Sequence, residues 1–303
     1  ALLSGSLDNA NSVEVTEGSL VQCMFNLVYY SQGGQPAWEL PVLRDARVVS
    51  AGDIVAIQQA GQIFFYDLKT GRPRNVWPRI DLLQKVVVGK ISKNQNSLFA
   101  EVHEFPENRA ALYKLYPGKE PQRLGFFPEG FPIENWGFHV LSDGDYAVGA
   151  THSKGVVLVK LDKDSNPSEP VYKIATEYEL KKKERYTTVI PLPNGEDFWV
   201  FDGKEHLGWP CKEETIGKEV SIPSRHALWS NAARWQGGVF FFSTDLWDKW
   251  AHTYFDPESR NRLELTEKSQ YHHMVLDRRL YMVERDGNSL VPVFGDFTAG
   301  RND

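Results

Sequence analysis

The sequence is poor in cysteine and lacks the marks of a glycosylated secreted protein. Its two cysteines, Cys23 and Cys211, lie far apart in the chain, and two cysteines make no disulfide framework. We therefore expect two buried free thiols, with a disulfide between them as the alternative in an oxidising compartment. No Asn-x-Ser/Thr sequon is present, which argues against a glycosylated eukaryotic secreted protein.

Long apolar runs and basic stripes are also missing. A membrane-spanning helix needs roughly 18 apolar residues, whereas the longest apolar stretch, 21–30, is interrupted by Gln22 and Asn26 and is expected to be a buried strand. The net charge of −6 comes from interspersed charges of both signs. We expect no membrane span and no nucleic-acid partner. The chain begins at Ala1 rather than Met, which favours an extracytoplasmic location, periplasmic or secreted, with the cytoplasm as the alternative.

Catalytic signatures are absent as well. The chain has no Gly-x-Ser-x-Gly elbow, phosphate-binding loop, His-Glu-x-x-His or Cys-x-x-Cys. The segment 162–166 alternates oxygen ligands as a calcium loop does, but Pro167 and Lys173 replace the Gly and Glu that such a loop needs. We predict no cofactor and no metal site. Whether the protein is an enzyme stays open, and a non-enzymatic role is favoured.

The chain does contain a repeated pattern of short apolar strands. Apolar residues make up 41% of it and aromatic residues 13%, which is ample for a core. Strands of about five residues alternate with Gly, Asn and Asp turns. The first strand of each unit is expected to start near residues 48, 86, 138, 188, 227 and 272. Four short strands fit the spacing of roughly 40 to 50 residues, which is the size of a propeller blade.

One turn resembles a known propeller repeat. The segment 65–72, Phe-Tyr-Asp-Leu-Lys-Thr-Gly-Arg, is similar to the Asp-x-x-Thr-Gly-Lys turn of quinoprotein-type repeats. That family places a Trp three residues after the basic residue and repeats the turn in blade after blade, whereas here Trp77 comes later and the turn occurs once. The resemblance to the β-propeller superfamily therefore concerns architecture. It implies no quinone cofactor.

We predict one all-β domain over 1–303, a β-propeller in which six blades are favoured and seven are the alternative. Residues 1–47 do not make a clean blade and are expected to complete the last blade and close the ring. Closure would remove exposed sheet edges. The structural alternative is a pair of β-sandwiches, which the absence of a linker disfavours.

Two groups of side chains are candidates for function. Partner binding is assigned to aromatic loops, because Trp and Tyr dominate binding hot spots. These residues are Trp247, Trp250, Tyr254, Asp245, Trp136 and Trp229. The second group is one histidine on the first strand of each of three units, where imidazoles lining a central channel could bind an ion or move protons. These residues are His139, His226 and His272.

The favoured function is a soluble, monomeric, macromolecule-binding propeller that presents these aromatic loops to a protein partner, such as an inhibitor or immunity-type protein. Fold-level analogy carries this interpretation. The alternative is a carbohydrate-binding or carbohydrate-hydrolysing propeller, a glycoside hydrolase if an enzyme, that uses carboxylates and Trp at the channel mouth. By position the carboxylates would be Asp45, Glu134 and Glu184.

Overall fold

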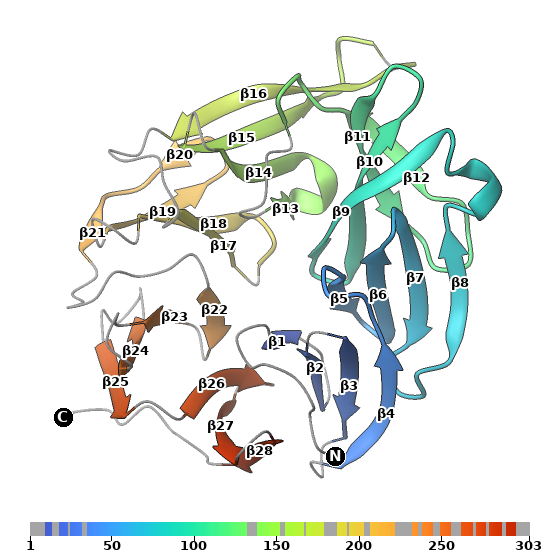
Figure 1. Ribbon diagram of the computed structural model, residues 1–303. Helices are drawn as coiled ribbons and strands as arrows, with labels where there is room; N and C mark the ends of the chain where they lie inside the picture. The colour runs from blue at the N-terminus through green and yellow to red at the C-terminus, as the bar shows by residue number, and fades with distance from the viewer. Residues whose placement is uncertain are drawn as a thin grey trace. The chain divides into compact units, whose positions relative to one another are not determined.

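The described part of the chain consists mainly of β-strands, with very little helix (Figure 1). The computed structural model describes residues 10–13, 18–23, 25–31, 35–131, 138–151, 155–166, 168–178, 187–192, 194–202, 207–221, 232–235, 238–244, 249–255, 262–268, 271–276, 279–286 and 289–294. Two 3-10 turns, η2 (Ile80–Leu82) and η3 (Ser142–Gly144), accompany the strands. The prediction of an all-β chain is confirmed. None of the helices found in these ranges is long and apolar enough to cross a membrane.

The chain divides into two compact units. The first comprises Ala1–Asp45, Lys69–Gly71 and Ile222–Asp303. Its strands form three antiparallel sheets, each in sequence order. The first sheet holds β1 (Ala10–Val13), β2 (Ser19–Cys23), β3 (Asn26–Tyr30) and β4 (Pro36–Pro41). The second holds β22 (Ala232–Trp235), β23 (Gly238–Thr244), β24 (Lys249–Phe255) and β25 (Arg262–Lys268). The third holds β26 (Tyr271–Leu276), β27 (Arg279–Asp286) and β28 (Ser289–Phe294).

The second unit comprises Ala46–Leu68 and Arg72–Ser221. Its first sheet holds β5 (Arg47–Ala51), β6 (Ile54–Gln59), β7 (Gln62–Asp67) and β8 (Pro73–Trp77). An eight-stranded sheet joins two four-strand groups. They are β9 (Val86–Asn94), β10 (Ser97–Glu104), β11 (Arg109–Leu115) and β12 (Gln122–Phe126), then β13 (Phe138–Leu141), β14 (Tyr146–Thr151), β15 (Gly155–Asp162) and β16 (Val171–Tyr178). The last sheet holds β17 (Thr187–Pro191), β18 (Asp197–Asp202), β19 (Leu207–Lys212), β20 (Thr215–Ile216) and β21 (Val220–Ser221).

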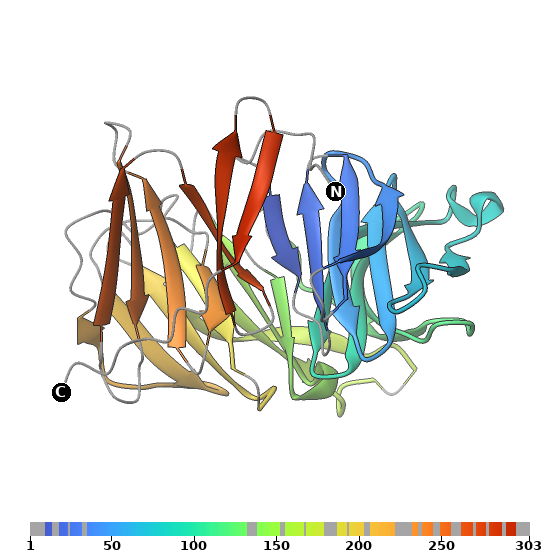
Figure 2. The same ribbon diagram turned by 90° about the horizontal axis from the view of Figure 1, so that it is seen from below.

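Local sequence explains these hairpins. Strands β6 and β7 read Ile-Val-Ala-Ile-Gln-Gln and Gln-Ile-Phe-Phe-Tyr-Asp, and β-branched and aromatic residues fit a pleated, half-buried surface. A two-residue loop joins them, in which Ala60 and Gly61 both have positive φ, at 50° and 76°. Such loops match the right-handed twist of the strands they join. In Figure 2 the strands are seen along their length, with the connections at their ends.

The core of the second unit lies between successive sheets. One apolar cluster, which includes Phe65, Trp77 and Leu115, joins β5–β8 to β9–β11. A second, which includes Phe99 and Tyr172, joins β10–β12 to β13–β16. A third joins β13–β16 to β17–β19. The first strands of successive groups lie together, since β9 lies against β5 and β13 and β13 lies against β17.

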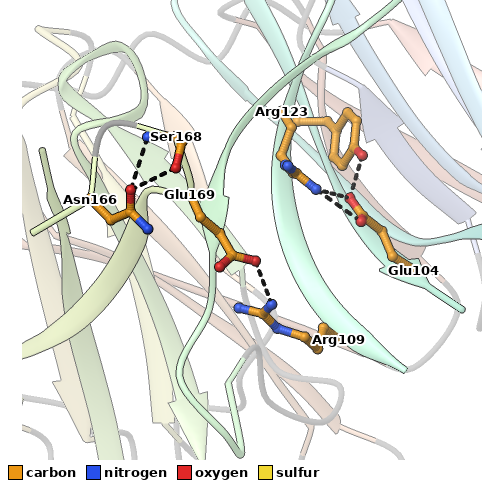
Figure 3. A network of polar contacts seen from close by, with 7 residues as sticks. Glu104, Arg109, Arg123, Asn166, Ser168 and Glu169 are labelled. Atoms are coloured by element: carbon orange, nitrogen blue, oxygen red, sulfur yellow. Dashed lines mark hydrogen bonds and ion pairs between the residues drawn. The ribbon is translucent and has the colours of Figure 1, made fainter. Parts of the chain in front are cut away.

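The two groups of the eight-stranded sheet meet at their fourth strands. Strand β12 runs parallel to β16 through one residue pair, Phe126 and Val171. The Phe126 amide donates to the Pro170 carbonyl at 3.0 Å. Figure 3 shows side-chain contacts beside this pair, where Arg109 bonds Glu169 at 2.8 Å. The Arg109 guanidinium also lies 3.6 Å from the centre of the Phe126 ring.

The predicted strands differ from the observed ones in two places. The expected single strand over 21–30 is a hairpin, because the chain turns at Phe25, which is 57% exposed, between β2 and β3. The expected first strand of the fifth unit lies largely outside the described residues, and β22 begins at Ala232. Strands β1–β4 pair with one another in a four-stranded sheet. The number of blades and the closure of the ring stay predictions.

Candidate binding surface

The connections of each four-strand group fall into two sets. Because neighbouring strands run antiparallel, the link between the second and third strands lies at the same end of the group as the link that leaves the fourth strand. The links from first to second and from third to fourth strand lie at the opposite end. We call the first end the apolar end and the second the polar end, for the side chains that each carries.

In the second unit the apolar end displays two large apolar side chains. Ile80, in the connection from β8 to β9, is 81% exposed, and Phe105, in the connection from β10 to β11, is 41% exposed. The other exposed large apolar residues of this unit lie on fourth strands, and they are Val76, Ile174 and Ile216. Within the described part of the unit, the polar-end connections carry no exposed large apolar side chain.

The two connections are hydrogen-bonded to each other. The Phe105 amide donates to the Lys85 carbonyl at 2.7 Å, and the Lys85 amide donates to the Leu82 carbonyl at 2.8 Å. The Gln62 side-chain amide donates to the Pro78 carbonyl at 2.8 Å. Ile80 and Phe105 therefore lie on connections that hydrogen bonds already hold in place. Less conformational entropy is then lost when these connections bind a partner.

Charges of both signs surround these apolar side chains. Arg79 and Asp81 flank Ile80 and pair at 3.4 Å, with side chains 72% and 63% exposed. Lys85 and Glu107 are exposed beside them. An apolar centre with a polar rim is the usual arrangement of a protein–protein interface.

The polar end of the unit is tied together by polar contacts. Arg74 pairs with Asp53 at 2.9 Å and with Asp67 at 2.8 Å. The buried Asn94 donates to the carbonyls of Val140 and Gly195, both at 2.8 Å. These contacts use the polar groups of the turns for internal bonding.

A buried acid and a histidine lie beneath the apolar end. Glu101 and His103 stand two residues apart on β10, on the same face of the strand. The Glu101 side chain is 5% exposed and the His103 side chain 34%, and His103 Nε2 lies 2.8 Å from Glu101 Oε1. The hydrogen bond to Glu101 raises the pKa of His103 against the opposing effect of burial.

The first unit shows the same distribution of apolar side chains within its own first sheet. Phe25 lies in the link between β2 and β3, and Leu43, 48% exposed, follows β4. The Val42 amide donates to the Phe25 carbonyl at 2.8 Å, so these two links are also joined.

The structure places two of the predicted aromatic residues on a strand rather than in a loop. Trp250 and Tyr254 belong to β24, where they pair with Thr244 and Phe240 of β23. Strand β24 begins at Lys249, and the partner-binding role of these two residues stays a prediction. The remaining candidates lie outside the described residues, and they are Trp136, Trp229, Asp245 and Trp247.

The predicted histidine cluster stays a prediction. His139 is half-buried on β13, the first strand of its group, and His272 lies on β26, the first strand of its sheet. His226 lies outside the described residues. The two placed histidines belong to different units.

The structure also describes the surroundings of a predicted free thiol, the calcium-like loop and one candidate carboxylate. Cys211 is a free, buried thiol, as expected, and burial raises its pKa to about 12. Asp162 pairs with Lys173 and accepts the Asp164 amide at 3.2 Å, as in an ordinary turn. Asp45 is exposed in a turn after β4, and Glu134 and Glu184 lie outside the described residues.

Sequence reasoning missed the residues that define this surface. The pattern Glu-x-His in a strand could have indicated Glu101 and His103, because alternate residues share a face. Nothing in the sequence marks Ile80 and Phe105, because the exposure of an apolar residue depends on the fold.

Comparison with known proteins supports the architecture. No protein-family model matches the chain, and neither does any curated protein. The β-propeller domain of Cps50 (Swd1) from Myceliophteria thermophila is similar with a TM-score of 0.59 at 10% identity, over 93% of this chain and 97% of that one. A complex of KlAtg21 with the coiled coil of AgAtg16 gives 0.56 at 12% identity, over 85% and 84% of the chains. The dihydro-heme d1 dehydrogenase NirN in complex with DHE gives 0.51 at 14%, over 97% and 66%.

These likenesses define the class of protein: the chain has a β-propeller fold. At such low identity they show the fold alone. The expected resemblance to β-propeller proteins is confirmed at the level of the fold.

Proposed function

We propose that this chain is a protein-binding β-propeller domain that docks its partner on the apolar end of its sheets. One observation carries the proposal. In the described part of the second unit, the exposed large apolar side chains outside the strands, Ile80 and Phe105, both lie in apolar-end connections. Within the first sheet of the first unit, Phe25 and Leu43 lie in the corresponding connections. Grouped exposed apolar side chains with a polar rim are typical of interaction sites.

The predicted aromatic residues extend the proposal. Trp136 falls between β12 and β13, Trp229 between β21 and β22, and Asp245 with Trp247 between β23 and β24. We include them as further partner-binding candidates.

A structural neighbour offers a parallel. KlAtg21, of similar fold, has been solved in complex with a coiled coil. This parallel supports a protein partner for the present chain.

The proposal is tested with charged substitutions at the apolar end. Ile80→Asp and Phe105→Asp each place a carboxylate on the surface, and Lys119→Glu, in the exposed connection from β11 to β12 at the polar end, is the matched control. Partners captured from the native source by the full chain are identified by mass spectrometry and titrated by calorimetry. Since hot-spot residues carry about 2 kcal/mol or more, we expect roughly 30-fold weaker binding for both apolar-end variants.

Lys119→Glu should bind as tightly as the parent chain. Equal affinity of all three variants would contradict the proposal. A glycan array probed with the same proteins covers the carbohydrate alternative, and stoichiometric glycan binding without a protein partner would replace the proposal by it.

A further inference from the structure

The β10–β11 hairpin carries a buried carboxylate with incomplete internal bonding. Glu101 is 4% exposed as a residue. Its Oε1 bonds His103, while its Oε2 is buried with no hydrogen-bond partner among the described residues. A buried charge is costly unless it is paired, so the free energy of this hairpin depends strongly on whether His103 carries a charge.

On the neighbouring strand, Lys90 lies opposite Glu101 and Gly89 lies against its carboxylate. The pairing of β9 with β10 shifts register between Glu101 and Val102, which leaves Gly89 as an extra residue. A Cβ on Gly89 would lie 3.1 Å from the Glu101 carboxyl carbon. The backbone of β9 therefore lies against the carboxylate and excludes a side chain at this point.

The groups that face His103 are few. Glu101 on its own strand and Lys90 on β9 are the charged groups that act on it, and Lys90 opposes its protonation. On β11, Ala110 lies opposite His103 and Leu112 opposite Glu101. The connection after β12 contributes Phe127 and Phe131 to the apolar cluster that contains Leu112. Within the described chain, Glu101 is thus the acidic partner of His103.

His103 also bonds the turn that carries Phe105. The Asn108 side chain makes a hydrogen bond to His103 that favours the charged imidazole. Asn108 stands in the turn between β10 and β11 with a φ of 52°, and non-glycine residues adopt this region rarely. Protonated His103 therefore bonds both the buried acid and the strained turn.

We infer that Glu101 and His103 form a pH-sensitive latch on the apolar end. With His103 protonated, both ring N–H groups are available and the latch holds the β10–β11 turn and Phe105 in their docking position. With His103 neutral, one N–H and the positive charge are lost, and the hold on the turn weakens. The inference rests on the proposed function for the role of Phe105, whereas the latch itself can be tested without a partner.

The direction of the pH dependence follows from the linkage between protonation of His103 and folding of the turn. The pKa of His103 is raised in the folded protein, so the latch is fully formed below the unfolded value of about 6.5 and is lost as the pH rises through the folded value. The size of the effect depends on how far the pKa of His103 in the folded protein exceeds its unfolded value. For each pH unit of that difference, the hydrogen-exchange protection of the turn should fall about tenfold in total as the pH rises.

Hydrogen exchange of the Phe105 amide tests the latch in the full chain. This amide donates to the Lys85 carbonyl, and the Ser142 amide, which donates to the Gly195 carbonyl at 2.7 Å at the polar end, is the internal reference. Between about pH 5.5 and 9, and after correction for intrinsic exchange, the protection of Phe105 should fall along the titration curve of His103 measured by NMR. The protection of Ser142 should not change.

Two variants separate the outcomes. In His103→Gln and in Glu101→Gln, the protection of Phe105 should stay at its high-pH level throughout, and Glu101→Gln should lower the pKa of His103. If Glu101→Gln does not fold, the comparison of the parent chain with His103→Gln decides alone. Protection that does not change with pH in the parent chain, or that changes equally in His103→Gln, overturns the latch. A working latch with unaltered partner binding by Phe105→Asp contradicts only the proposed function.

Discussion

Asn94 shows how one side chain can hold several turns. It lies at the end of β9, is 8% exposed, and donates two hydrogen bonds to carbonyls of residues distant in sequence, Val140 and Gly195. Gly195 has a φ of +76°, and a Cβ there would lie 2.7 Å from the Asn94 oxygen. The close approach of this turn thus requires both the amide and the glycine.

Removal of this amide should destabilise the fold. Asn94→Ala removes the side-chain donor to the buried Val140 carbonyl and one of two donors to the Gly195 carbonyl, which keeps the Ser142 amide. An unsatisfied buried group costs about 1–3 kcal/mol. We expect the free energy of unfolding, measured by urea titration at pH 7, to fall by about that amount. Gln95→Ala removes one exposed hydrogen bond to the Asn194 carbonyl and is the control. It should change stability by less than about 0.5 kcal/mol, and equal effects of the two substitutions would contradict this role of Asn94.

At the scale of elements, strands could be recognised in the sequence where most of their side chains are buried and therefore apolar. Strands β6 and β14 are almost continuous apolar runs, so residue types alone indicate them. The fourth strands β12 and β16 carry exposed polar positions that interrupt the apolar pattern, so residue types alone do not indicate them. The run 21–30 was misread for the opposite reason, since apolar residues continue through a turn.

The junction of β12 and β16 depends on side chains, because a single residue pair joins the strands. Arg109→Ala removes the stack on Phe126 and the ion pair with Glu169. A partly exposed cation–π contact is worth about 0.5–1 kcal/mol, and an exposed ion pair adds little. We expect the protection of the Phe126 amide in hydrogen exchange to fall by about fivefold.

Arg109→Lys should lose less of this protection, since the charge stays but the planar stack does not. Arg79→Ala, at an exposed ion pair away from this junction, is the control and should leave Phe126 unchanged. Unaltered protection in Arg109→Ala would contradict a stabilising role for the stack.

At the scale of the whole molecule, the repeat in the sequence predicted the architecture better than the site. Spacing and turn residues are set by the backbone, so they are readable from one chain. The docking surface depends on which apolar residues stay uncovered, as with Ile80 and Phe105, and on a register shift that places Gly89 against Glu101. Neither property can be read from residue types alone.

The central claim is that a protein partner binds the apolar end. The most direct measurement is hydrogen exchange of the full chain with and without the captured partner, analysed by mass spectrometry. The account predicts partner-dependent protection in peptides that cover residues 78–87 and 103–109. Protection confined to polar-end connections, such as 116–121, would contradict it.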